Sequence, residues 1–152
     1  MTLQEGSWGE GGDHRVWLNK ETEWTWDRLY DAEQALIERL GKTPPGGNTA
    51  LHRRLLAQAC REALLLQASD WQFLITTWSA RDYAERRFAE HYAEFKRLLE
   101  LLDKVHAGGD VTPEEEESVL RRLEHEDFLF PDLDPGWTQR APALAGSEGR
   151  PA

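Results

Sequence analysis

A tryptophan lies inside a glycine-rich stretch near the start of the chain. Residues 6–12 contain four glycines in seven positions and show no helical period, which predicts a loop that carries Trp8. An indole on a loop can fold back as a core anchor, or it can offer its flat face to a ligand that has an apolar face and a polar rim. Sugars fit the second description, because their C–H faces stack on aromatic rings while their hydroxyls require carboxylates and amides. Both interpretations of Trp8 are open on physical grounds.

An aspartate interrupts an apolar stretch in the middle of the chain. Asp70 lies between Leu66 and Trp71, where an ionised group costs free energy unless it caps a helix or binds something. Capping a helix N-terminus is the simpler role. The alternative is that this carboxylate accepts hydrogen bonds from ligand hydroxyls in the wall of a cleft.

The other side chains that could do chemistry lack a productive arrangement. The five histidines fall in five separate segments, without a His-Glu-x-x-His motif or a pair four residues apart, which argues against a metal site. Cys60 has no adjacent base, so we expect a small core residue rather than a nucleophile. The glycines of residues 6–12 neither follow a strand nor open a helix, and they lack the lysine of a phosphate-binding loop. We therefore expect neither a metal nor another cofactor.

Length and charge exclude several classes of protein. With 152 residues the chain cannot hold a complete eight-stranded α/β barrel, which takes about 250 residues. Lys and Arg number 18 against 28 Asp and Glu, and the net charge of −10 argues against a nucleic-acid partner. No segment is apolar over the length of a membrane span, and no basic and then apolar stretch follows Met1. We expect a cytoplasmic protein with no membrane partner.

The first half of the chain predicts two helices that carry an apolar face. Asn19 can cap the first, which ends at Gly41. Asn48 can cap the second, whose apolar side runs into the continuous apolar residues 63–66. Because this second helix is hydrophobic nearly all round, we expect it to be central and buried.

The second half predicts a short helix over residues 71–77 and then a long one. Ser79, with an acid three residues later, resembles a capping box that opens a helix reaching about Lys104. Thr112, followed by proline and acids, caps a last helix. From Phe128 onward the pattern predicts an extended chain.

Together these elements predict a single all-α bundle of about four to five helices. We expect residues 1–20 to form a loop that faces a substrate, residues 21–135 to form the helical domain, and residues 136–152 to be a disordered tail rich in Ala, Gly and Pro. Tryptophan is the residue most in excess, with seven in the chain. Core packing is the favoured role for four of them: Trp24, Trp26, Trp71 and Trp78.

Three motifs of this chain resemble those of a known family. They are residues 6–19 (GSWGEGGDHRVWLN), 66–77 (LQASDWQFLITT) and 83–91 (YAERRFAEH), and residues 130–134 (FPDLD) are similar to the family's C-terminal end. In this order and spacing they resemble the C-terminal helical domain of the glycoside hydrolase family 57 branching enzymes. The resemblance spans about residues 5–135.

The resemblance implies a role in 1,4-α-glucan branching. In that reaction an α-1,4 bond is cut with retention and the chain is passed to a 6-hydroxyl of a glucan, which requires two carboxylates about 5–5.5 Å apart. In the family both carboxylates stand on an N-terminal α/β barrel, so no residue of this chain is assigned as catalytic. The implied partners are an α-1,4-glucan and that barrel, either in the same chain or as a separate one.

The resemblance also implies substrate-binding residues, carried over motif by motif. Trp8 matches a tryptophan that contacts substrate, and Trp17 matches a second aromatic residue that handles glucan. Asp70 matches a substrate-binding aspartate beside a tryptophan, here Trp71. Ser79 falls at a polar position that is often glutamine in the family, with a tryptophan before it where glycine is common.

Two other functions are compatible with the same residues. The chain can be a non-catalytic bundle that binds glucan or docks onto a partner and acts on its own. It can also be a helical interaction protein whose tryptophans all belong to the core.

Overall fold

The computed structural model describes residues 6–136. The predicted tail, residues 136–152, lies outside this part except for Gly136, and residues 1–5 of the predicted loop lie outside it as well.

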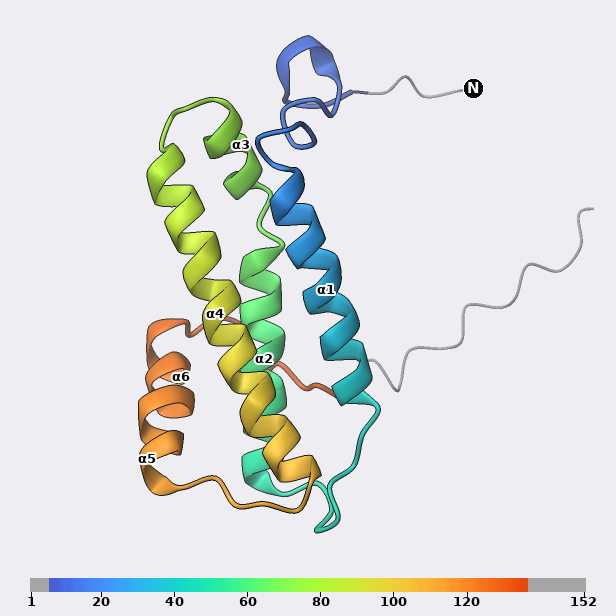
Figure 1. Ribbon diagram of the computed structural model, residues 1–152, viewed down its shortest axis with the longest axis vertical. Helices are drawn as coiled ribbons and strands as arrows, with labels where there is room; N and C mark the ends of the chain where they lie inside the picture. Colours follow the sequence, from blue (N-terminus) through green and yellow to red (C-terminus); the bar gives the residue numbers. More distant parts are fainter. Residues whose placement is uncertain (1–5, 137–152) are drawn as a thin grey trace, which may run out of the picture.

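The described chain is all-helical, as predicted, and forms a bundle (Figure 1). None of its helices is long and apolar enough to cross a membrane. A short 3₁₀ turn and four principal helices are followed by three short helical pieces. These elements are η1 (Glu10–Gly12), α1 (Glu23–Leu40), α2 (Ala50–Leu66), α3 (Asp70–Thr76), α4 (Arg81–His106), α5 (Pro113–Glu115), the π-helical η2 (Glu116–Arg121) and α6 (Arg122–Glu126).

Helix α2 is central and buried, which confirms the prediction from its apolar pattern. Eleven of its seventeen residues are buried, and α1 and α4 pack along it (Figure 1). Leu55 and Ala59 of α2 are fully buried and belong to the same core cluster as the equally buried Phe88 and Phe95 of α4. Burying a leucine or phenylalanine side chain stabilises the fold by about 1.5–3 kcal/mol, so the large residues of this cluster contribute strongly to the core.

The first two helices begin later than their asparagines predict. Asn19 does not cap α1: its side-chain oxygen accepts a hydrogen bond from the backbone N–H of Glu21, which forms a separate turn before the helix. Thr22 stands at the N-cap position instead. Helix α2 is capped by Thr49, whose hydroxyl accepts the His52 N–H at 3.1 Å, one residue beyond the predicted Asn48 cap.

Two capping predictions around α3 are wrong. Asp70 is the first residue of α3 rather than its cap, and Ser69 precedes it without a side-chain capping bond. Asp70 is exposed, so water already solvates the carboxylate and no cap is needed to offset burial. Ser79 does not cap α4 either, because Ala80 holds that position and the Ser79 hydroxyl pairs with the Thr77 hydroxyl at 2.9 Å.

The C-terminal part starts and ends as predicted. The Thr112 hydroxyl accepts the Glu115 N–H and the Glu115 carboxylate accepts the Thr112 N–H, which completes a capping box before the short helices. The helix ends before Phe128, and the chain then continues without helix to Gly136. Arg61 of α2 fixes this last segment by donating to its backbone carbonyls, including that of Leu129 at 2.7 Å.

Two histidines meet at the end of the bundle where α2 begins and α4 ends. The Nε2 atoms of His52 and His106 are 3.0 Å apart, so one ring donates and the other accepts. Both Nδ1 atoms are buried without a hydrogen-bond partner. Burial lowers the pKa of both rings, and the cations Arg53, near His52, and Lys42, near His106, lower the pKa further.

We predict that this pair makes the protein less stable in mild acid. Because the folded-state pKa values of His52 and His106 lie below the ordinary value of 6.5, protons bind the unfolded chain preferentially. The free energy of unfolding should therefore fall as the pH drops from about 7.5 to about 5. The double variant His52→Gln with His106→Gln should show a shallower fall in urea unfolding measured across this range.

The exposed His125 supplies the matched control for this measurement. His125→Gln should leave the dependence of unfolding free energy on pH unchanged. A double variant that keeps the full wild-type slope would show that other groups cause the acid sensitivity.

Candidate functional site

A cleft with a volume of about 800 Å³ lies between the N-terminal loop, the first two turns of α1 and the start of α3. We call it the aromatic cleft. Its size is that of a small-molecule or oligosaccharide site. Its lining consists of Ser7, Trp8, His14, Trp17, Leu18, Glu23, Trp26, Asp27, Tyr30 and Ser69.

The loop that carries Trp8 is held in shape by its own hydrogen bonds. The Ser7 hydroxyl donates to the Asp13 carbonyl and accepts the Gly9 N–H. A Cβ on Gly9 would lie 2.8 Å from the Asp13 carbonyl oxygen, so glycine is required at this close approach. The Asp13 carboxylate binds Arg15 at 2.6 Å, and this hydrogen bond lowers the pKa of Asp13. The loop thus presents Trp8, whose side chain is 93% exposed, from a bonded scaffold.

Trp17 connects the loop to two helices. Its indole N–H donates to the Ser69 carbonyl at 3.0 Å, at the start of α3. Its ring lies against Phe73 with centroids 6.1 Å apart. Its own backbone carbonyl accepts the Trp26 indole N–H and the Thr22 hydroxyl, each at 2.8 Å. Trp17 therefore fixes the relative positions of the loop, α1 and α3.

Asp70 is not among the residues that line the aromatic cleft, but its neighbour in the chain is. It follows Ser69, which lines the cleft, and it is exposed on the first turn of α3. The structure thus brings Trp8 and Trp17 together in one cleft, and Asp70 directly follows a third lining residue in the chain.

Trp71 and Ser79 are not part of the cleft lining. The Trp71 indole N–H donates to the Leu65 carbonyl at 2.7 Å, and its ring faces His91, so it points into the bundle and anchors α3. Ser79 is exposed in the turn between α3 and α4. Trp78, beside it, is 68% exposed with Arg81 over its ring, which overturns the prediction that Trp78 is a core residue.

The cleft contains residues that the sequence patterns did not single out. Trp26 packs against the core, as expected, but also lines the cleft together with Tyr30. Trp24 faces the core, where its ring and that of Phe88 pack edge to face with centroids 5.3 Å apart. The signal that separates the two tryptophans is helical spacing: residues 23, 26, 27 and 30 form one side of α1.

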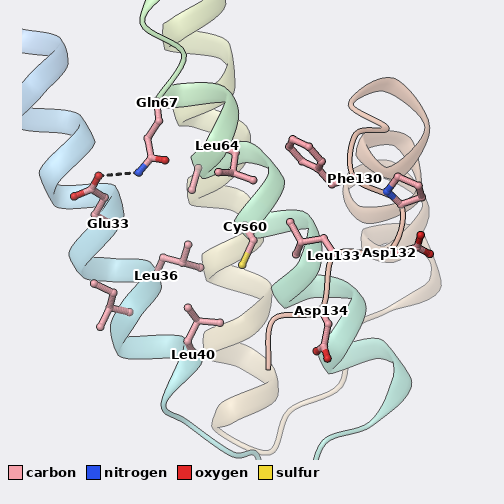
Figure 2. A pocket seen from close by; sticks show the side chains of 13 residues that line it. Glu33, Leu36, Leu40, Cys60, Leu64, Gln67, Phe130, Asp132, Leu133 and Asp134 are labelled. Carbon is pink, nitrogen blue, oxygen red and sulfur yellow. Dashed lines mark hydrogen bonds between the residues drawn. The ribbon is translucent and has the colours of Figure 1, made fainter. Parts of the chain in front are cut away.

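A second hollow, of about 1050 Å³, lies between α1, α2 and residues 130–134 (Figure 2). We call it the apolar groove. Most of its surface is apolar, and Leu36, Leu40 and Leu64 are among its lining residues. Glu33 and Gln67 join α1 to α2 across its rim at 2.8 Å, and Cys60 also lines it (Figure 2).

Cys60 is buried, as predicted for a small core residue. Burial raises the pKa of its thiol to about 11. The thiol is therefore protonated near neutral pH, which does not suit a nucleophile.

Within residues 6–136 one group of three side chains could offer ligands to a metal: Glu62, His91 and Asp127, whose ligand atoms lie within 4.8 Å of one another. Hydrogen bonds already occupy the ligand atoms of Glu62 and His91. The Arg87 guanidinium can only donate, so the Nε2 atom of His91 accepts its hydrogen bond at 3.0 Å. The Nδ1–H of His91 then donates to the Glu62 carboxylate at 2.9 Å. The Glu62 carboxylate also accepts from Gln58.

This cluster is better suited to holding the core together than to binding a cation. A metal would need the Nδ1 lone pair of His91 and would lie close to the Arg87 guanidinium, which is 3.9 Å from the Asp127 carboxylate. Burial raises the pKa of Glu62, and the hydrogen bonds from His91 and Gln58 oppose that effect. Sequence spacing missed the cluster because its members come from α2, α4 and the end of α6.

The fold and the cleft define a class: an all-helical domain that presents an aromatic wall suited to a carbohydrate. The particular family follows from comparison with known proteins. The family model for the C-terminal part of 1,4-alpha-glucan branching enzymes matches residues 28–137, and the chain belongs to this family.

Individual relatives agree with this assignment. The 1,4-alpha-glucan branching enzyme TK1436 of Thermococcus kodakarensis is 44% identical over 131 residues, which is 86% of this chain and 18% of the relative. The crystal structure of a GH57-type branching enzyme from Pyrococcus horikoshii is similar with a TM-score of 0.80 and 38% identity, covering 89% of this chain and 24% of that one. The crystal structure of TK1436 in complex with glucose and additives gives a TM-score of 0.78 and 40% identity, covering 88% and 23%.

These matches cover about a fifth to a quarter of each relative. Most of each branching enzyme therefore lies outside the part that aligns with this chain.

We predict that the Trp17 indole contributes to stability through its hydrogen bond to Ser69. Trp17→Phe keeps an aromatic ring beside Phe73 but removes the N–H donor. The free energy of unfolding, measured by urea denaturation, should fall by about 0.5–1.5 kcal/mol. Trp8→Phe, at a fully solvated indole, should change it by less than about 0.5 kcal/mol. Equal stability of Trp17→Phe and wild type would contradict this role.

Proposed function

We propose that this domain forms one wall of the glucan-binding cleft of a 1,4-α-glucan branching enzyme. The observation that carries the proposal is the placement of Trp8. Its indole is almost fully exposed, on a loop held by internal hydrogen bonds, beside Trp17 and Trp26 in the aromatic cleft. Keeping an indole exposed to water costs free energy, and stacking a sugar face on the indole would recover it.

Each predicted site residue has a role in this proposal. Trp8 stacks on a glucose ring, and Trp17 supports the platform through its bonds to α1 and α3. The exposed Asp70 carboxylate accepts hydrogen bonds from glucan hydroxyls at the margin of the cleft. Trp71 holds α3 in place through its hydrogen bond to the Leu65 carbonyl of α2. The glucan contact of Ser79 is a prediction from the family motif.

The proposed reaction is retaining transfer of an α-1,4-glucan chain to a 6-hydroxyl. It requires a nucleophilic carboxylate and an acid/base carboxylate, which the family resemblance places on the catalytic barrel. The residues of this chain would bind and orient the acceptor glucan and limit the access of water, which competes with the sugar hydroxyl. The aromatic wall is suited to both tasks because it is flat, apolar and fixed.

The proposed partner is the catalytic barrel of the same enzyme, in the same chain or as a separate one. The large share of each relative that lies outside the aligned part supports this partner. A role in glycogen synthesis in the cytoplasm is the corresponding proposal for its cellular function.

A second function is a non-catalytic bundle that binds glucan or docks onto a partner by itself. The observation that favours it is that residues of this chain alone form the aromatic cleft. The two functions differ in whether the chain needs a barrel.

We predict that the chain binds glycogen through Trp8. Migration in a native gel should be retarded by glycogen in the gel, and Trp8→Ala should abolish most of the retardation because the stacking face is lost. Phe128→Ala, which removes another exposed aromatic ring outside the cleft, should migrate like wild type. Unretarded migration of the wild-type chain would contradict glucan binding.

We further predict that the isolated chain does not branch amylose. Without the two barrel carboxylates there is no nucleophile to form the glycosyl-enzyme intermediate. New α-1,6 linkages, counted by ¹H NMR after incubation, should stay at the level of a heat-denatured control. Appreciable branching by the chain alone would show that it carries its own catalytic carboxylates.

A further inference from the structure

The aromatic cleft continues beyond the loop along one side of α1. Glu23, Trp26, Asp27 and Tyr30 line it at positions i, i+3, i+4 and i+7, so they form a single stripe on the helix. With a rise of about 1.5 Å per residue, this stripe is about 10 Å long, which is more than one sugar ring. We call it the α1 stripe.

The α1 stripe alternates aromatic rings with carboxylates. The rings of Trp26 and Tyr30 have centroids 6.1 Å apart and an interplanar angle of 38°. The Tyr30 side chain is 61% exposed, and the carboxylates of Glu23 and Asp27 are exposed as well. Flat apolar faces with carboxylates between them match the C–H faces and hydroxyls of consecutive sugar residues.

The stripe is also held in a fixed position. The Trp26 indole N–H donates to the Trp17 carbonyl at 2.8 Å, which ties α1 to the loop platform. On the opposite side, Leu29 and Trp24 pack into the core. Because these side chains are already fixed, they lose little conformational entropy when a ligand binds.

We propose that the α1 stripe is an outer glucan subsite. Tyr30 stacks on a glucose residue remote from Trp8, and the Asp27 carboxylate accepts hydrogen bonds from the hydroxyls of that glucose. This inference rests on the proposed glucan function. The stripe makes binding depend on chain length: a short maltooligosaccharide occupies the Trp8 and Trp17 end, and a longer one continues along α1 to Tyr30.

The test compares maltotriose with maltoheptaose on the full chain by isothermal titration calorimetry. Tyr30→Ala should raise the Kd for maltoheptaose about threefold to tenfold, the range of one lost aromatic contact, and leave the Kd for maltotriose unchanged. Tyr30→Phe keeps the ring and should bind both ligands like wild type. Trp8→Ala should weaken the binding of both ligands.

Two controls separate this inference from the function on which it rests. Phe128→Ala removes a comparably exposed ring outside the cleft and should change neither Kd. If Trp8→Ala weakens binding while Tyr30→Ala leaves both Kd values at the wild-type level, the outer subsite is refuted and the proposed function stands. If the wild-type chain binds neither oligosaccharide, the proposed function and the subsite are both refuted.

Discussion

The arrangement of this domain depends on polar side chains buried along its central helix. Gln58, Arg61 and Glu62 of α2 are all buried, and an unpaired charge in such a place costs several kcal/mol. Each is therefore bonded to another element. Glu62 accepts from His91 of α4, and Arg61 donates to backbone carbonyls of the C-terminal segment. Apolar contacts alone would let these elements slide, whereas the directional bonds set where each lies against α2.

The same central helix supports the functional end of the molecule. The last turn of α2 offers the Leu65 carbonyl to the Trp71 indole, and the Trp71 ring lies beside His91 of the buried cluster. Trp71 thus holds α3, whose preceding Ser69 carbonyl accepts the Trp17 indole. Trp17 in turn holds Trp26 and the loop. A series of three indole hydrogen bonds connects the core to the aromatic cleft. The position of the loop that carries Trp8 therefore depends on packing in the core of the bundle.

Local patterns in the sequence predicted the helices and their faces well, because helical spacing depends on near neighbours. The central place of α2 and the Thr112 cap both follow from residues a few positions apart. The cap of α1 could not be located this way, because the amide of Asn19 is bonded to the Thr76 hydroxyl, a partner far away in the sequence. The Glu62 cluster was missed for a related reason, because its members come from segments distant in the sequence. Tyr30 was missed because the cleft that it lines is also formed by the N-terminal loop and Ser69.

The acidic character of the domain fits the chemistry proposed for its cleft. The chain carries a net charge of −10, and Glu23 and Asp27 add carboxylates to the cleft itself. A phosphorylated ligand would be repelled by this field. A glucan is neutral, so it approaches at no electrostatic cost and uses both features, the rings for its C–H faces and the carboxylates for its hydroxyls. The negative charge therefore disfavours an anionic ligand and is compatible with an uncharged, hydroxyl-rich one.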